Sequence, residues 1–252
     1  IAGLPHAQSL ALENLAVIAE RRRQYGLALE RYLQAVSGLR RIGQASMLGT
    51  MAHNLGYLYL RLGDVAQAAA MARFAESLFK RGLAAPVVAQ GDDLRARIAA
   101  RVGRNEEALS ALSHAREIRR ASGDQVADGD ELEARLALDD GDVRGARLAL
   151  DRARGVDPAP RAKAEYALVE AEWMRANGEG AAEVLVAARE ALALCRASGD
   201  EDFVVEAHLL VAEVARVIGD RELLLAHVEA AGALRDAMLR EVPDSHRSMF
   251  LG

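Results

Sequence analysis

The sequence predicts an all-α fold built from about six antiparallel helical hairpins. Of the 252 residues, 51% are apolar but only 4% are aromatic, a composition that suits closely packed helices better than a β-sandwich or barrel. Glycine accepts the left-handed conformation that ends a helix, and turn glycines recur at intervals of 40, 38, 37 and 41 residues. They are Gly63, Gly103, Gly141, Gly178 and Gly219. This spacing predicts one tight turn inside each repeat unit.

The prolines lie near the expected boundaries between hairpins. They are Pro5, Pro86, Pro158, Pro160 and Pro243. A proline inside a helix costs about 3 kcal/mol or more, so their positions agree with the predicted hairpins.

The first three hairpins are expected at about residues 7–43, 46–83 and 86–122. The first keeps Ala28 and Ala35, with Tyr32 between them, and the third keeps Ala108 and Ala115 after its turn glycine. Small residues at these positions let the second helix of a hairpin lie close to the first.

The last three hairpins are expected at about residues 125–155, 160–198 and 201–240. The fourth is short, and the fifth carries an extra residue in its turn, NGEGAAEV. The pentapeptide RASGD occurs at 120–124 and again at 196–200, where one hairpin should end and the next begin. Its Ser-Gly-Asp combines a helix stop with a helix start.

The second hairpin has the most regular pattern. Leu55-Gly56 places a large apolar residue beside a gap, and Tyr59 follows on the same face one helical turn later. Gly63 ends the first helix, and Asp64 is placed to cap the second. Three spaced alanines then form a small-residue stripe, Ala68, Ala72 and Ala75.

This order of residues, L-G-x-x-Y, then G-D, then spaced alanines, resembles the tetratricopeptide (TPR) repeat. The resemblance covers about residues 7–240 and has a longer period than the 34 residues of the simplest TPR. It is similar to arrays attached to large bacterial regulators, including ATP-binding transcription activators and serine/threonine kinases. It implies a right-handed superhelical solenoid, forming one domain over residues 1–252, that binds other proteins.

In such an array the first helices of the hairpins line a concave surface where partners bind. One turn-spaced row on these helices predicts the contact residues His53, Tyr57, Arg61, Arg97, Arg101, Arg135, Glu172 and Glu213. We expect a partner with an acidic or aromatic feature to lie across Tyr57, Arg97 and Arg135. The alternative is that these are ordinary solvated polar positions.

Arginine recurs at 40-residue intervals near the end of each of the first three such helices, at Arg21, Arg61 and Arg101. A cation there complements the negative end of the helix dipole, and an anion-binding ladder is the alternative interpretation. TPR proteins that grip a peptide carboxylate use lysines and asparagines on the first three hairpins. Asn54 stands at one of these positions, but the others carry Glu13, Val17, Gln90 and Leu94. Binding of chaperone tails is therefore not expected.

The sequence predicts no catalytic residue, metal site or cofactor. The six histidines form no H-E-x-x-H motif or i, i+4 pair. Cys195, the one cysteine, lies in an apolar helical run, where a buried inert thiol is expected. Trp173 is expected to fill the core of the fifth hairpin. An enzyme is therefore not expected.

The net charge and the hydropathy of the sequence limit the classes of partner that we expect. The formal net charge of −5 is mild and its signs are interspersed, so no nucleic-acid-binding surface is predicted. No apolar run approaches the roughly 18–20 residues that span a bilayer, and the cytoplasm is the expected location. The chain begins at Ile1 without a methionine, so we expect it to be part of a longer protein.

Three functions remain open. The first is a protein-interaction scaffold in a larger bacterial signalling protein, and the second is a small-molecule effector domain that controls an attached output domain. The third is a homodimerisation scaffold, which uses Met249, Phe250 and Leu251 of the tail, residues 241–252. Otherwise the tail is expected to cap the last hairpin or to dock on a neighbouring domain.

Overall fold

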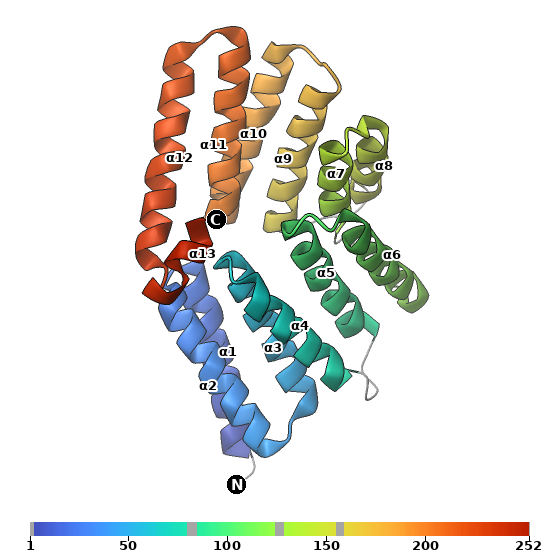
Figure 1. Cartoon of the computed structure of the whole chain (residues 1–252), viewed down its shortest axis with the longest axis vertical. Helices are drawn as coiled ribbons and strands as arrows, with labels where there is room; N and C mark the ends of the chain where they lie inside the picture. The colour runs from blue at the N-terminus through green and yellow to red at the C-terminus, as the bar shows by residue number, and fades with distance from the viewer. Residues whose placement is uncertain (1–2, 80–84, 124–128, 155–158, 252) are drawn as a thin grey trace. The chain divides into compact units, whose positions relative to one another are not determined.

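The computed structural model describes residues 3–79, 85–123, 129–154 and 159–251. Every regular element among these residues is a helix, so the described chain is all-α, as predicted (Figure 1). The chain divides into two compact units. Unit 1 comprises residues 1–125 and 238–252, and unit 2 comprises residues 126–237. No helix in the described ranges has the length and apolar character needed to cross a membrane.

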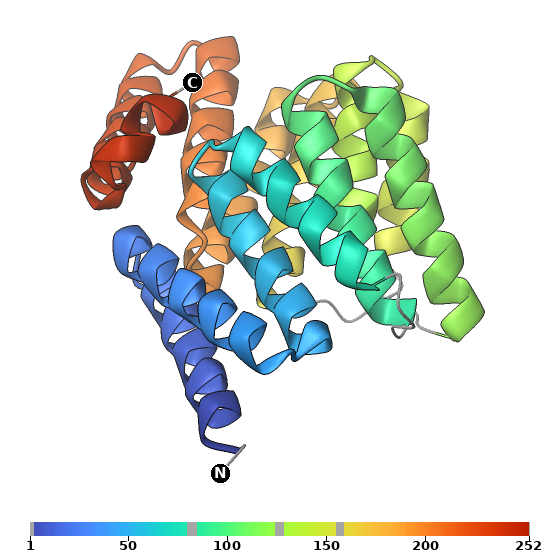
Figure 2. The same ribbon diagram turned by 60° about the horizontal axis from the view of Figure 1, so that its bottom comes forward.

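Unit 1 contains three helix pairs, and the two helices of each pair pack against each other (Figures 1 and 2). The pairs are α1 (Gly3–Arg21) with α2 (Tyr25–Ile42), α3 (Ala45–Arg61) with α4 (Val65–Phe79), and α5 (Ala85–Arg101) with α6 (Asn105–Ser122). The C-terminal segment adds the end of α12, the 3-10 helix η1 (Asp244–His246) and α13 (Arg247–Leu251).

Unit 2 is built in the same way. Its helices are α7 (Asp130–Asp139), α8 (Val143–Ala153), α9 (Pro160–Ala176), α10 (Ala181–Ser198), α11 (Glu201–Ile218) and α12 (Arg221–Glu241). Consecutive helices α7–α8, α8–α9, α9–α10 and α10–α11 are in contact. Their core is rich in alanine: Ala164, Ala171, Ala188 and Ala191 are fully buried with Leu168 and Cys195.

The turns inside the pairs follow the glycine pattern of the sequence. The five predicted turn glycines have φ between +72° and +79°, the left-handed region that favours glycine. In the α1–α2 turn Arg23 takes this conformation instead, with φ of 63°. Asp64 caps α4 as predicted, because its Oδ1 accepts a hydrogen bond from the Gln67 amide at 3.0 Å. Asp220 caps α12 in the same way, accepting from the Leu223 amide at 2.9 Å.

Small residues bring neighbouring helices together where the sequence predicts a gap. A Cβ atom at Gly56 would lie 2.8 Å from the side chain of Leu94 on α5 and 3.5 Å from that of Met71 on α4. The second distance is an ordinary van der Waals contact, but the first is too short, so the Leu94 side chain would have to shift to admit a Cβ atom. Gly56 therefore allows α3 to pack closely against α4 and α5 at once.

The C-terminal segment packs on the turns of the first two helix pairs of unit 1. Met238, Val242 and Phe250 are buried, and the backbone of Met249 lies directly over Gly63. His246 stacks on Tyr59, with ring centroids 6.0 Å apart, and its Nε2 lies 3.5 Å from Asp64 Oδ2. The segment thus packs on the first two helix pairs of unit 1. The sequence suggested two other locations, a cap on the last hairpin or a neighbouring domain.

Candidate binding faces of the two units

The first helices of successive pairs are neighbours within each unit. In unit 1, α3 packs against α5, and in unit 2, α9 packs against both α7 and α11. Residues at equivalent positions on these helices therefore share a side of their unit. This geometry brings several of the predicted contact residues together.

In unit 2 the predicted residues Arg135, Glu172 and Glu213 meet two further charged residues, Glu206 and Arg175. We call these five residues the polar face of unit 2. Arg135 Nη1 on α7 lies 2.7 Å from Glu206 Oε2 on α11. Because α9 lies between α7 and α11, this ion pair spans three helices. Arg175 Nη1 on α9 lies 3.1 Å from Glu213 Oε1 on α11.

Glu172 occupies the middle of the polar face. It forms no hydrogen bond or ion pair with any described residue, because Arg135 is engaged by Glu206. Burial raises the pKa of Glu172, and the nearby Arg135 only partly offsets that rise. Glu172 is thus a half-buried carboxylate that makes no hydrogen bond within the described chain.

Arg135 is the principal cation of the polar face. Burial alone lowers the pKa of its guanidinium, but the carboxylates of Glu206, Glu172 and Glu165 outweigh burial and raise the pKa overall. Its Nε and Nη2 atoms are buried and donate no hydrogen bond within the described chain. The sequence suggested that Arg135 contacts an acidic partner. In the structure, carboxylates of this chain already surround its guanidinium.

In unit 1 the predicted row begins with His53 and Tyr57, whose rings are in contact. His53 is only 8% exposed, and its ring meets that of Tyr57 edge to face at 4.9 Å. Burial lowers the pKa of His53 to about 4, so the imidazole is neutral near pH 7. His53 therefore lies in the interior, while Tyr57 is half-buried at the edge of the face.

The predicted arginines of unit 1 differ in their surroundings. Arg61 Nη1 lies 3.8 Å from Glu20 Oε1 on α1, so this arginine links two first helices. Arg97 is half-buried, and Arg21 and Arg101 are exposed. Because Arg61 is engaged by a carboxylate, these residues do not form a uniform ladder of solvated cations.

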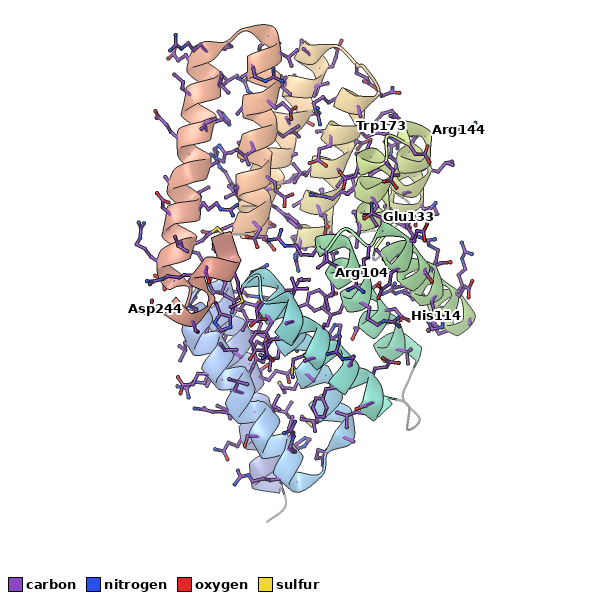
Figure 3. All side chains as sticks on the ribbon, in the orientation of Figure 1. Arg104, His114, Glu133, Arg144, Trp173 and Asp244 are labelled. Atoms are coloured by element: carbon purple, nitrogen blue, oxygen red, sulfur yellow. The ribbon has the colours of Figure 1, made fainter. Side chains whose placement is uncertain are left out.

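Cys195 is buried as the sequence predicts, whereas Trp173 packs toward α7 and α8 and does not fill the core of the fifth hairpin. Cys195 is fully buried, and burial raises the pKa of its thiol to about 11, so it stays protonated. Trp173 is half-buried at the α7–α8 side of α9 (Figure 3). Its Nε1 donates a hydrogen bond to the carbonyl of Val143 at 2.9 Å, and the guanidinium of Arg147 lies 4.8 Å from the ring centre.

Sequence reasoning missed a histidine cluster in unit 2. Nδ1 of His208 on α11 lies 3.1 Å from Nδ1 of His227 on α12, and Nε2 of His208 lies 3.2 Å from Nη2 of Arg196 on α10. The signal sought was an i, i+4 pair on one helix, whereas this pair forms across two helices. Among the residues that the structure describes, no group of three or more His, Cys, Asp or Glu side chains could hold a metal ion.

Comparison with known proteins gives one structural likeness. No protein-family model and no curated protein matches the chain. Among solved structures, the crystal structure of BtubC (BKLC) from P. vanneervenii is similar, with a TM-score of 0.56 over 90% of this chain and 92% of that chain. The sequence identity is 19%, so the likeness concerns the fold alone: this chain shares a helical fold with BtubC.

Proposed function

We propose that the chain is a protein-interaction scaffold, the regulatory part of a larger bacterial signalling protein. In this proposal the helix pairs form a right-handed superhelical solenoid of about six antiparallel hairpins, similar to a TPR array. The support for the architecture is the TPR-like residue order, together with first helices that pack side by side in each unit.

The observation that carries the binding proposal is the polar face of unit 2. Its five charged side chains come from three successive first helices, and Arg135 and Glu206 reach across α9 to meet. The alternative is that these ion pairs only stabilise the packing of the helices. That alternative accounts for Arg135, Glu206, Arg175 and Glu213 but leaves Glu172 without a partner. The carboxylate of Glu172 is half-buried and makes no hydrogen bond within the described chain. It can therefore accept one from a partner, which favours a role for Glu172 in binding.

The charge of this face indicates the chemistry of the partner. Three carboxylates, Glu172, Glu206 and Glu213, face two guanidiniums, and Glu165 adds a further negative charge near Arg135. Electrostatic complementarity favours a partner of opposite sign. We therefore expect a polypeptide that presents a lysine or arginine to Glu172. This partner differs from the acidic or aromatic one that the sequence suggested.

The test is affinity capture from a lysate of the native cells with three immobilised proteins. They are the wild type, Glu172→Gln, and the control Glu190→Gln, which removes the same charge from an exposed position on α10. We expect a polypeptide that wild type and control retain, and that binds Glu172→Gln about tenfold more weakly, a loss of about 1.4 kcal/mol.

Folding of each variant is verified by the fluorescence of Trp173, the one tryptophan of the chain. Equal retention by all three proteins would remove the polar face from the proposal. If nothing is retained by any of them, the scaffold function itself is contradicted.

A further inference from the structure

A cavity of about 370 Å³ opens between α10, α11 and α12 in unit 2. Its lining residues are Arg196, Gly199, Glu201, Val204, His208, Ala230 and Leu234. The cavity combines an apolar wall with one guanidinium, one carboxylate and one imidazole. It is separate from the polar face of unit 2, and none of its residues belongs to that face.

The hydrogen bonds at this cavity fix the protonation of both histidines. A guanidinium can only donate, so Arg196 donates to Nε2 of His208. Neutral His208 must then carry its proton on Nδ1, which donates to Nδ1 of His227. His227 in turn carries its proton on Nε2. The result is a one-way chain of donors from Arg196 through His208 to His227.

The charges around this chain are predominantly positive. Arg196 and Arg189 form no ion pair with any described carboxylate. Burial lowers the pKa of His227, and the charges of Arg189 and Arg196 lower it further. Burial, His227 and Arg196 together lower the pKa of His208 to about 4. Glu201, on the same helix as His208, is the carboxylate that lines the cavity. Both imidazoles are therefore neutral near pH 7, beside a guanidinium that forms no ion pair with a described carboxylate.

We propose that this cavity binds a small anion, a carboxylate or phosphate group, on Arg196, and that binding is coupled to proton uptake by His208. The cavity offers the three things such a ligand needs: space, a guanidinium free of carboxylate partners and a second donor that appears on protonation. Guanidinium groups recognise both carboxylate and phosphate through paired hydrogen bonds.

The proton taken up on anion binding is accepted by Nε2 of His208. A ligand anion that accepts from Arg196 draws the guanidinium away from Nε2 of His208. A proton from solvent then adds to that Nε2, which donates to the anion, while Nδ1 keeps its proton and still donates to His227. Direct protonation of His227 at Nδ1 would instead place two N–H groups against each other. His208 is therefore the group that takes up the proton.

The test measures the pKa of His208 and His227 by NMR of protein labelled with ¹⁵N in its histidine rings. Titrations are recorded in inorganic phosphate, in succinate and in sodium chloride at the same ionic strength. An anion within about 4–6 Å raises a histidine pKa by about one unit or more. We expect that rise for His208 in phosphate, in succinate or in both, relative to chloride, and the responding salt identifies the preferred group.

Two variants make the result specific to the cavity. Arg196→Gln removes the anchor, and the control Arg189→Gln removes the same charge from the same helix outside the cavity. Both arginines are exposed, so folding is expected to be kept. The anion response should persist in Arg189→Gln and vanish in Arg196→Gln. If neither salt differs from chloride, or if Arg196→Gln responds as strongly as the wild type, the proposal is overturned.

Discussion

His53 shows how a polar residue can be drawn into the interior by its neighbours. The sequence places it on an open binding row, but it is buried against the ring of Tyr57. Its Nδ1 atom makes no hydrogen bond within the described chain. Burial favours the neutral imidazole over the charged one, so this residue links folding to pH.

We predict that His53 makes the protein sensitive to acid below pH 6.5. Its pKa falls from 6.5 to about 4 on folding, so unfolded chains bind the proton more readily than folded ones. The free energy of unfolding is unaffected by His53 above pH 6.5 and falls by about 3 kcal/mol between pH 6.5 and 4. Urea unfolding at several pH values measures this loss.

The matched variants for this measurement are His53→Leu and Tyr57→Leu. The first removes the titrating group, so the loss attributed to His53 should disappear. The second removes the neighbouring ring and keeps the imidazole, so most of the loss should remain. An identical pH dependence in His53→Leu and the wild type would show that His53 does not cause the sensitivity.

The sequence predicted the positions of polar residues better than their partners. It named Arg135, Glu172 and Glu213, which the structure brings to one face. It did not name Glu206, which pairs with Arg135 from a helix two pairs further along the chain. Helical periodicity tells which residues share one face of a helix. It does not tell which side chain of another helix will be in reach, because that depends on how the helices pack.

At the scale of elements, turn chemistry was the most informative signal. Each predicted turn glycine has positive φ, and Asp64 and Asp220 cap the helices that follow. These features are local, so a few residues determine them. The docking of the C-terminal segment was not predictable, because it joins residues from opposite ends of the sequence.

Substitutions at two glycines distinguish the free-energy cost of straining a turn from the cost of displacing the C-terminal segment. Gly63 and Gly103 have nearly the same φ, +78° and +72°. A Cβ at Gly103 would meet no atom within 4 Å, whereas one at Gly63 would overlap the Met249 carbonyl. Gly103→Ala should cost about 1 kcal/mol from the left-handed backbone alone, and Gly63→Ala should cost more.

Urea unfolding and limited trypsin digestion test this difference. Gly63→Ala should also speed cleavage after Arg247, because the C-terminal segment must move away from the α3–α4 turn. Gly103→Ala should leave that cleavage rate unchanged. Equal destabilisation by the two substitutions, with equal cleavage after Arg247, would contradict the docking described above.

At the scale of the whole molecule, the all-helical class followed directly from composition and turn spacing. The arrangement of the helices as about six hairpins stays a prediction. The proposed single array over residues 1–252 stays a prediction, since the chain divides into two compact units. Sequence patterns report local repeats, whereas the grouping of repeats into units depends on the packing between them.

Binding through the polar face of unit 2 can also be tested inside cells, at an exposed residue close to that face. Leu209 lies on α11 one turn after Glu206 and one turn before Glu213, and it is 48% exposed. Leu148 on α8 is similarly exposed, at 56%, and belongs to the second helix of its pair. The two positions therefore compare the proposed binding face with a surface of equal apolar character.

The most direct test is photo-crosslinking in the native cells, with a photoreactive amino acid in place of Leu209 or of Leu148. A scaffold that binds through the polar face should give a discrete polypeptide adduct at position 209, weakened by Glu172→Gln and absent at position 148. No adduct at position 209, or the same adducts at both positions, would contradict the proposed function.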